Sequence, residues 1–221
     1  MPRSAQPATA ALTPSWSFVS KNLELLRQRI EQIVLIIILP TLFIDLGSIL
    51  MPTRSALGWT ILALGIAWWL FNIGASYYLQ ISAAKEKIVS TADCYRKSWQ
   101  YISRVIAFTI FFSVIVFVGF LLLIIPGVLL VRRYVLTPYY IVDKNMSIRQ
   151  AMAQSAKQTK PVAGYVWGTL GVIVVLLLVI TLISSIFFAI PGATVIVSAL
   201  LSPAYFFLLA LRYIDIVKNA T

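Results

Sequence analysis

The chain has 221 residues, of which 60% are hydrophobic, and its 18 Lys and Arg against 7 Asp and Glu give a net charge of +11. A soluble domain of this length cannot bury so much apolar surface, so the composition indicates an integral membrane protein. There is one cysteine and no histidine, which excludes an intrachain disulfide and argues against a Cys/His zinc site and a histidine general base.

The first segment, residues 1–15, is rich in Pro, Ala, Ser and Thr and predicts a disordered leader. It lacks the apolar stretch and cleavage site of a signal peptide, so we expect no cleavage. Residues 16–221 form a single predicted membrane domain. Long apolar runs recur through this domain, and each marks a predicted membrane-spanning helix. The six runs are 33–51, 57–82, 105–125, 128–142, 162–190 and 193–211.

The fourth run, 128–142, is the shortest. As a helix it would cover about 22 Å, less than the ~30 Å of a hydrocarbon core, and it contains Arg132 and Arg133. A re-entrant hairpin is the alternative, but it would place the basic loop 144–160 outside the cell. We therefore expect a full span with locally thinned lipid.

A proline pattern occurs twice in the second half of the chain. Pro126-Gly127 is followed by Pro138, and Pro191-Gly192 is followed by Pro203, so that the prolines of each pair lie 12 positions apart. Proline interrupts helices, so these positions are the predicted helix breaks. The repetition predicts an all-α membrane fold of six spans in three parallel repeat units, about 16–82, 83–143 and 144–221.

An amphipathic stretch precedes each predicted hairpin. In the first, apolar residues recur every three or four positions from Val19 to Ile33. The second and third begin with capping boxes at Ser90 and Ser147. Each unit is therefore expected to consist of an amphipathic helix at the cytoplasmic interface followed by a helical hairpin.

The basic residues lie on one side of the predicted spans. Fifteen precede the first span, follow the last, or lie in the long loops, whereas the opposite side has only Arg54. This distribution places both termini in the cytoplasm of a bacterial inner membrane. It also favours anionic lipid headgroups over nucleic acid as the partner of the positive charge. The predicted lipid-facing basic rim consists of Lys21, Arg27, Lys85, Lys87, Arg96, Lys97, Arg149, Lys157 and Lys160.

Three charges fall within predicted spans. Asp45, Arg132 and Arg133 are expected at similar depths, and an isolated charge there costs roughly 2.5–3.5 kcal/mol. We therefore expect Asp45 to form an ion pair with one of the arginines. The pair would serve as a structural contact between repeat units or, alternatively, would line a solute path that suits an anion.

Two sets of small and polar residues predict helix contacts. Gly65, Asn72 and Ser76 share one face of the second span and form a predicted bundle-facing polar stripe. A glycine ridge in the fifth span predicts close helix packing, with a dimer interface as the alternative. The ridge consists of Gly164, Gly168 and Gly171.

One stretch of about 36 residues resembles a known family. It runs from 125 to 160 and reads IPGVLLVRRYVLTPYYIVDKNMSIRQAMAQSAKQTK. The stretch contains, in this order, Pro-Gly, a short arginine-containing span, Asp143 and a capped helix with Ser155. This order resembles that of the bacterial YciC-like membrane proteins and of the membrane domain fused to some glycerophosphodiester phosphodiesterases. The resemblance implies the architecture, and no catalytic residue is carried over from it.

These observations favour a non-enzymatic envelope or scaffold protein. Its basic interfacial helices would engage anionic lipid or a protein partner at the cytoplasmic face, and a homo-oligomer is an open alternative. The other functional class is a small-solute transporter or channel that uses the intramembrane charges. No catalytic, phosphate-binding or metal-ligand motif occurs, so we expect no enzymatic activity and no cofactor.

Overall fold

The computed structural model describes residues 13–50, 56–122, 124–186, 196–197 and 200–220, and every secondary-structure element in this part of the chain is helical. The all-α prediction is confirmed for these residues. Within this described part, four helical segments are long and apolar enough to cross a membrane. They are Ile30–Ser48, Ala56–Ala84, Ile102–Leu121 and Ala163–Ile186.

The first apolar run forms a nearly continuous helical segment after the amphipathic helix α1 (Ser17–Gln28). It consists of α2 (Ile30–Ile33), a π-helical turn η2 (Val34–Ile38) and α3 (Leu39–Leu50). The π turn lies directly before Pro40, which has no N–H to donate to the carbonyl four residues earlier. A π turn is one way in which a helix accommodates such an interruption.

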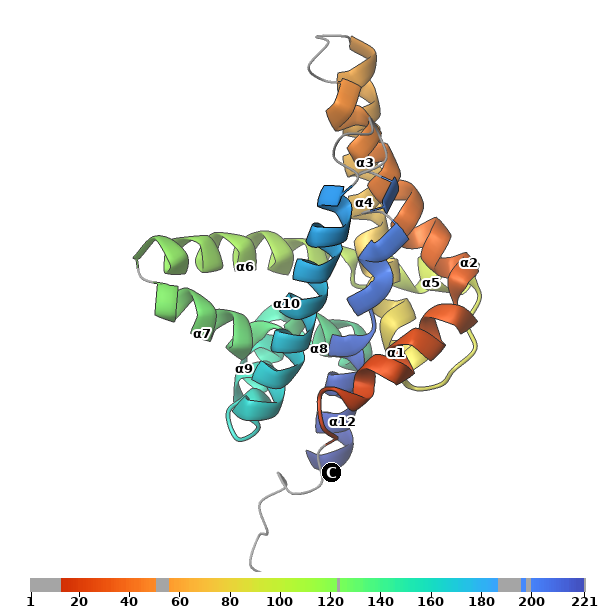
Figure 1. Cartoon of the computed structure of the whole chain (residues 1–221). Helices are drawn as coiled ribbons and strands as arrows, with labels where there is room; N and C mark the ends of the chain where they lie inside the picture. Colours follow the sequence, from red (N-terminus) through yellow and green to blue (C-terminus); the bar gives the residue numbers. More distant parts are fainter. Residues whose placement is uncertain (1–12, 51–55, 123, 187–195, 198–199, 221) are drawn as a thin grey trace, which may run out of the picture.

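The next helix, α4 (Ala56–Ala84), returns along α3, and together they form a column that rises above the rest of the molecule (Figure 1). Two glycines permit this close approach. A Cβ atom at Gly47 would lie 2.5 Å from the backbone nitrogen of Leu62, and one at Gly65 would lie 2.8 Å from that of Ile44.

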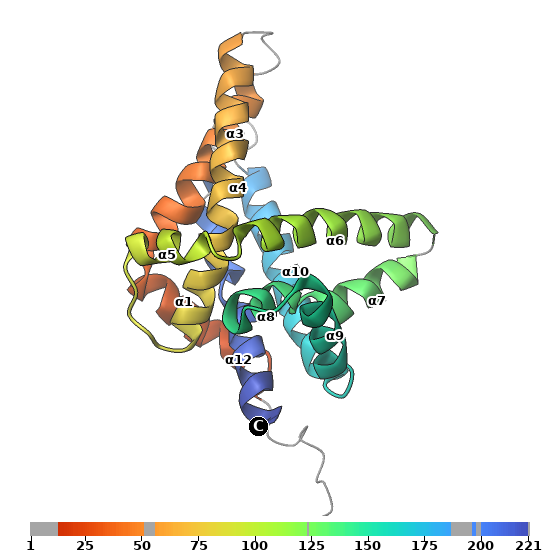
Figure 2. The same cartoon turned by 180° about the vertical axis from the view of Figure 1, so that it is seen from behind.

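A second hairpin follows α5 (Thr91–Ser98) and consists of α6 (Ile102–Leu122) and α7 (Ile124–Tyr134). It extends sideways from the column, so that α6 lies across α4 and α10 (Ala163–Ile186) in both Figure 1 and Figure 2. This arrangement differs from the predicted bundle of parallel spans. α6 packs on α4, on α8 and along α7, while several of its other apolar side chains, such as Phe117 and Leu121, are exposed.

The remaining helices close the base of the molecule. They are α8 (Thr137–Lys144), α9 (Ile148–Thr159), the 3₁₀ turn η4 (Ser202–Tyr205) and α12 (Leu208–Ala220). Stacked and edge-on tyrosine rings join α8 and α12 to α4: Tyr77 contacts Tyr139, and Tyr139 contacts Tyr213. The Tyr213 hydroxyl donates to Asp143 at 2.8 Å, and Asp143 also accepts from Lys85.

The predicted fourth span, 128–142, is not one helix. It is divided between α7 and α8, because Pro138 occupies the first turn of α8, where its missing N–H costs least. Pro203 likewise lies in the first turn of η4, which interrupts the described part of the segment 193–211. The described residues therefore do not confirm six spans, and the threefold repeat stays a prediction.

The other predicted breaks have different outcomes. The break between α6 and α7 precedes Pro126, which lies in the first turn of α7. Gly127 lies inside α7 and packs on α6, where an added Cβ would lie 2.9 Å from the backbone nitrogen of Phe120. Gly127 therefore permits helix contact and is not a break. Pro191 and Gly192 lie outside the described residues.

The predicted interfacial helices correspond to α1, α5 and α9. Ser90 accepts a hydrogen bond from the Asp93 backbone at 3.1 Å, and Ser147 and Gln150 form the predicted capping box of α9. The last part of the predicted leader is tied to the fold, since the Thr13 backbone donates to Asp215 at 3.0 Å and the Ser15 hydroxyl donates to the Tyr165 carbonyl at 3.2 Å.

Candidate anion-binding site

A highly charged recess lies between α7 and α9. The last turn of α7 carries Arg132 and Arg133. The Ser155 hydroxyl of α9 donates to the Arg133 carbonyl at 2.8 Å, which fixes the end of α7 on α9. Ala153 and Ala156 are small enough to leave space beside this contact. The result is a hollow of about 510 Å³.

Four cations and two alanines line this hollow, which we call the four-cation hollow. The cations are Arg132, Arg133, Lys157 and Lys160. No acidic residue is among the described residues that line it, and none of the four cations takes part in an ion pair within the described chain. Like charges that converge without counter-ions create a local positive potential that attracts anions.

Arg132 has an unsatisfied donor. Its Nε atom is buried and has no acceptor among the described residues. Buried polar atoms are rarely left without a partner, so an unpaired donor on a cation in such a hollow points to a missing acceptor. An anionic oxygen would supply that acceptor and would reduce the repulsion between the neighbouring positive charges.

The predicted intramembrane charge cluster does not form. Arg132 and Arg133 face α9 at the base of the sideways hairpin, whereas Asp45 lies on α3 in the column (Figure 1). The described residues show no ion pair between Asp45 and either arginine. The expectation of similar depth assumed that 128–142 spans the membrane beside the first span, and the break before Pro138 removes that assumption.

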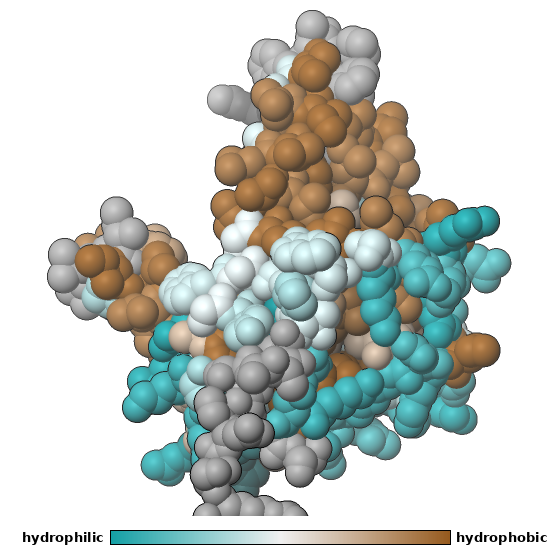
Figure 3. Space-filling view, turned by 60° about the horizontal axis from the view of Figure 1, so that its bottom comes forward, coloured by the Kyte–Doolittle hydropathy of each residue, from teal (hydrophilic) through white to brown (hydrophobic). Residues whose placement is uncertain are grey.

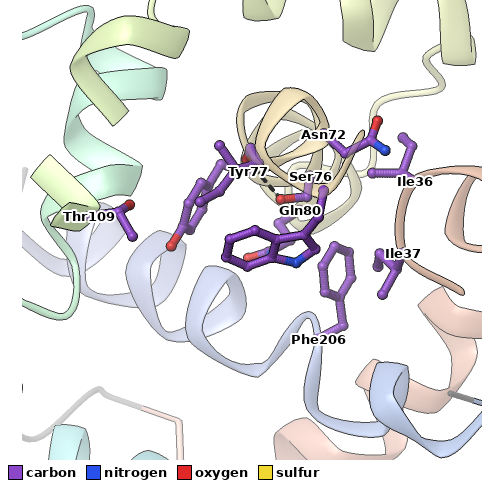
Figure 4. Close-up of a pocket in the computed structure, with 10 residues that line it drawn as sticks. Ile36, Ile37, Asn72, Ser76, Tyr77, Gln80, Thr109 and Phe206 are labelled. Carbon is purple, nitrogen blue, oxygen red and sulfur yellow. Dashed lines mark hydrogen bonds between the residues drawn. The ribbon is translucent and has the colours of Figure 1, made fainter. Parts of the chain in front are cut away.

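The predicted polar stripe of α4 does face inward. Gly65 is buried against α3, and Asn72 is 1% exposed and accepts a hydrogen bond from the Tyr95 hydroxyl. Asn72 and Ser76 also line a cavity of about 250 Å³, shown in Figure 4. The glycine ridge of α10 is closely packed at one of its three positions: a Cβ at Gly168 would lie 2.6 Å from the Ser15 hydroxyl, whereas one at Gly164 or Gly171 would meet no described residue within 4 Å.

The predicted basic rim is exposed in the structure, with Lys21 partly so. Figure 3 shows hydrophilic residues gathered around the base of the molecule, while the column and the end of the sideways hairpin are hydrophobic. Three rim cations have acidic partners: Lys21 pairs with Glu86 at 2.9 Å, Lys85 pairs with Asp143, and Arg96 pairs with Asp93. The Lys21 hydrogen bond lowers the pKa of Glu86. Lys157 and Lys160 differ from these cations because they belong to the four-cation hollow.

Two buried polar residues were not identified from the sequence. Arg212 is fully buried and donates to Thr169, Ser15 and Asp215, each at 2.9 Å. Asn22 of α1 donates to the Ala204 carbonyl and accepts from the Phe207 backbone. The sequence offers only a weak signal for them, namely an arginine that follows a long apolar run and a neutral amide among charged residues.

The comparisons with known proteins add no relative. Comparison of the chain with models of protein families, with curated proteins and with solved structures gave no match. The resemblance to the YciC-like proteins therefore stays a prediction.

Proposed function

We propose that this protein is a non-enzymatic, multi-pass protein of the bacterial inner membrane that holds anionic lipid headgroups at its basic face, with the four-cation hollow as its main binding site. The observation that carries the proposal is the convergence of four cations on one recess without an acidic residue in its described lining. Phosphate oxygens accept charge-assisted hydrogen bonds from Arg and Lys, so a phosphate group suits this lining.

The apolar hairpin beside the hollow favours a lipid over a soluble anion. α7 begins with apolar side chains, of which Ile125 is 72% exposed and Leu129 46% exposed, and it ends with the two arginines. A lipid alongside α7 would place its acyl chains against the apolar end and its phosphate at the basic end. This combination of apolar contact and positive charge is what binds proteins to anionic membranes.

The proposed orientation places the basic face in the cytoplasm, together with both termini. It is supported by the distribution of Lys and Arg and by exposed tryptophans near the basic helices: Trp16 is 74% exposed and Trp99 is 67% exposed. Tryptophan favours the headgroup region. In this orientation the hairpin α6–α7 lies within the hydrocarbon near the inner surface, since α6 is apolar on all sides.

The test is lipid retention by the purified protein, measured by native mass spectrometry with dioleoyl phosphatidylglycerol and dioleoyl phosphatidylcholine. The hollow variant changes all four cations to Gln, and a matched control changes four other exposed cations to Gln. The hollow variant carries Arg132→Gln, Arg133→Gln, Lys157→Gln and Lys160→Gln, and the control carries Lys87→Gln, Arg96→Gln, Lys97→Gln and Arg149→Gln.

We expect the hollow variant to bind phosphatidylglycerol at least about tenfold more weakly, because its four cations converge on one headgroup site and all of their charge-assisted contacts are lost together, whereas the control cations lie outside that site. The control should change affinity by less than about twofold, and phosphatidylcholine should bind weakly to every form. Equal losses in the two variants would show that the attraction is diffuse and would overturn the assignment of the hollow. No preference of the wild type for phosphatidylglycerol would overturn lipid binding and leave a protein partner as the alternative.

A further inference from the structure

A second cavity, separate from the four-cation hollow, lies between η2, α4 and α6. Its volume is about 250 Å³. In Figure 4, Thr109 of α6 lies on one side of this cavity, and Ile36 and Ile37 of η2 lie on the other. α4 supplies a row of polar side chains spaced by four residues, Asn72, Ser76 and Gln80. We call it the amide cavity.

Two amide groups in this lining have unused donors. The Nδ2 atom of Asn72 is buried and has no acceptor among the described residues, since only its oxygen is used, by Tyr95. Gln80 is 6% exposed, and its one hydrogen bond within the described chain is accepted by its oxygen from the Tyr139 hydroxyl at 2.5 Å. The buried Asn72 nitrogen therefore needs an acceptor that the described chain does not supply, and the Gln80 nitrogen can donate to a ligand in the cavity.

The lining determines which kind of molecule fits. No charged residue is among the described residues that line the cavity, so an ionic ligand would have no counter-charge. The other walls are apolar and include Ile73 and Phe206. Trp69, which is 43% exposed, also lines the cavity and marks the side that opens to the surroundings. These walls suit an uncharged molecule with an apolar body and hydrogen-bond acceptors.

The size and location of the cavity indicate a ligand that enters from the bilayer. Cavities that enclose a whole ligand measure roughly 300–1,000 Å³, and the amide cavity is smaller, so it accommodates only part of a larger molecule. Asn72 and Ser76 lie within the apolar helix α4, which is one of the candidate spans. The rest of the ligand would therefore remain among lipid chains.

We propose that the amide cavity binds an uncharged acylglycerol, whose ester and hydroxyl oxygens accept hydrogen bonds from the Asn72 and Gln80 amides. One acyl chain lies against the aliphatic and aromatic walls, and the remainder leaves the cavity beside Trp69. This site is independent of the four-cation hollow, which recognises charge, whereas the amide cavity recognises neutral oxygen atoms and excludes charged headgroups.

The test combines a cavity-filling variant with a neutral probe. Ser76→Leu places a larger side chain in the cavity, and Thr60→Leu makes a similar change on an exposed part of the same helix. Binding of dioleoylglycerol is measured by native mass spectrometry on the full chain. We expect Ser76→Leu to weaken binding by about tenfold or more and Thr60→Leu to change it by less than about twofold.

The hollow variant separates this proposal from the proposed function. It should lose phosphatidylglycerol and keep dioleoylglycerol, whereas Ser76→Leu should do the reverse. Equal binding of dioleoylglycerol to wild type and Ser76→Leu would overturn the amide cavity as its site, and no binding to wild type would indicate a cavity filled by water only.

A second measurement uses the unaltered protein in case Ser76→Leu does not fold. A diacylglycerol with a diazirine on one acyl chain is cross-linked to the wild type, and the modified peptides are sequenced. We expect modification within residues 69–80. Modification confined to the exposed surface of α6 and α7 would overturn the proposal.

Discussion

The contact between α3 and α4 provides a sharp test of the structure. A Cβ atom at Gly47 would lie 2.5 Å from the backbone nitrogen of Leu62 and 2.6 Å from its Cα atom. Backbone atoms cannot rotate away as a side chain can, so Gly47→Ala forces the two helices apart. Gly171→Ala in α10 is the matched control, because its Cβ would meet nothing within 4 Å.

Two opposing terms determine the size of the effect. Overpacking a tight contact costs about 1–3 kcal/mol, whereas alanine in place of a helical glycine gains up to about 1 kcal/mol of helix propensity. For Gly47→Ala the steric cost prevails, and we expect the free energy of unfolding to fall by about 1–2 kcal/mol. For Gly171→Ala only the gain remains, so we expect a rise of roughly 0.5–1 kcal/mol.

The assay is thermal unfolding in detergent, followed by the intrinsic fluorescence of the six tryptophans. A chain of this size shifts its Tm by about 2–4 °C per kcal/mol, so Gly47→Ala should unfold about 2–8 °C below the wild type. An unchanged or higher Tm for Gly47→Ala would refute the close contact. A loss of stability in Gly171→Ala would show that another surface, such as a second copy of the chain, covers that face of α10.

Three other predictions concern buried groups. Arg212→Met should lower the free energy of unfolding by about 3 kcal/mol, because Asp215 loses its cation. Adding Asp215→Asn to this variant should restore part of the lost stability. Equal stability of the wild type and Arg212→Met in a denaturant titration would contradict the pairing. The Cys94 thiol is buried, and burial raises its pKa to about 11. It should therefore resist alkylation by iodoacetamide near pH 8 until the protein is unfolded in SDS. Labelling of the folded protein at the rate of a free thiol would contradict the packing of α5. Ser147→Ala should cost about 1 kcal/mol through loss of the α9 cap, and Ser147→Asp should retain most of that stability in the same unfolding assay.

The sequence predicts correctly those features that depend on neighbouring residues. Ser147 and Gln150 lie three residues apart and therefore form the capping box wherever α9 is placed. Asn72 and Ser76 lie four residues apart and therefore share a face of α4, and both line the amide cavity. Composition alone predicts helices long and apolar enough to span a membrane.

The sequence could not determine which distant side chains meet. It predicts that Asp45 pairs with Arg132 or Arg133, because a charge among apolar residues requires a partner and Asp45 is the acid expected at that depth. The structure instead ends α7 before Pro138, and Arg132 lies beside Lys157. The buried position of Arg212 likewise depends on Ser15 and Thr169, which are far away in the sequence.

The sequence by itself determined that the chain is helical, apolar, suited to a membrane and basic on one side, because these properties follow from residue type and spacing of a few positions. The tertiary structure alone decided that α6 and α7 extend sideways, that four cations converge on one recess with no acid in its described lining, and that the Asn72 nitrogen of α4 is buried without an acceptor among the described residues. Helix breaks change the direction of everything after them, and a local pattern contains no information about the direction in which the next helix runs.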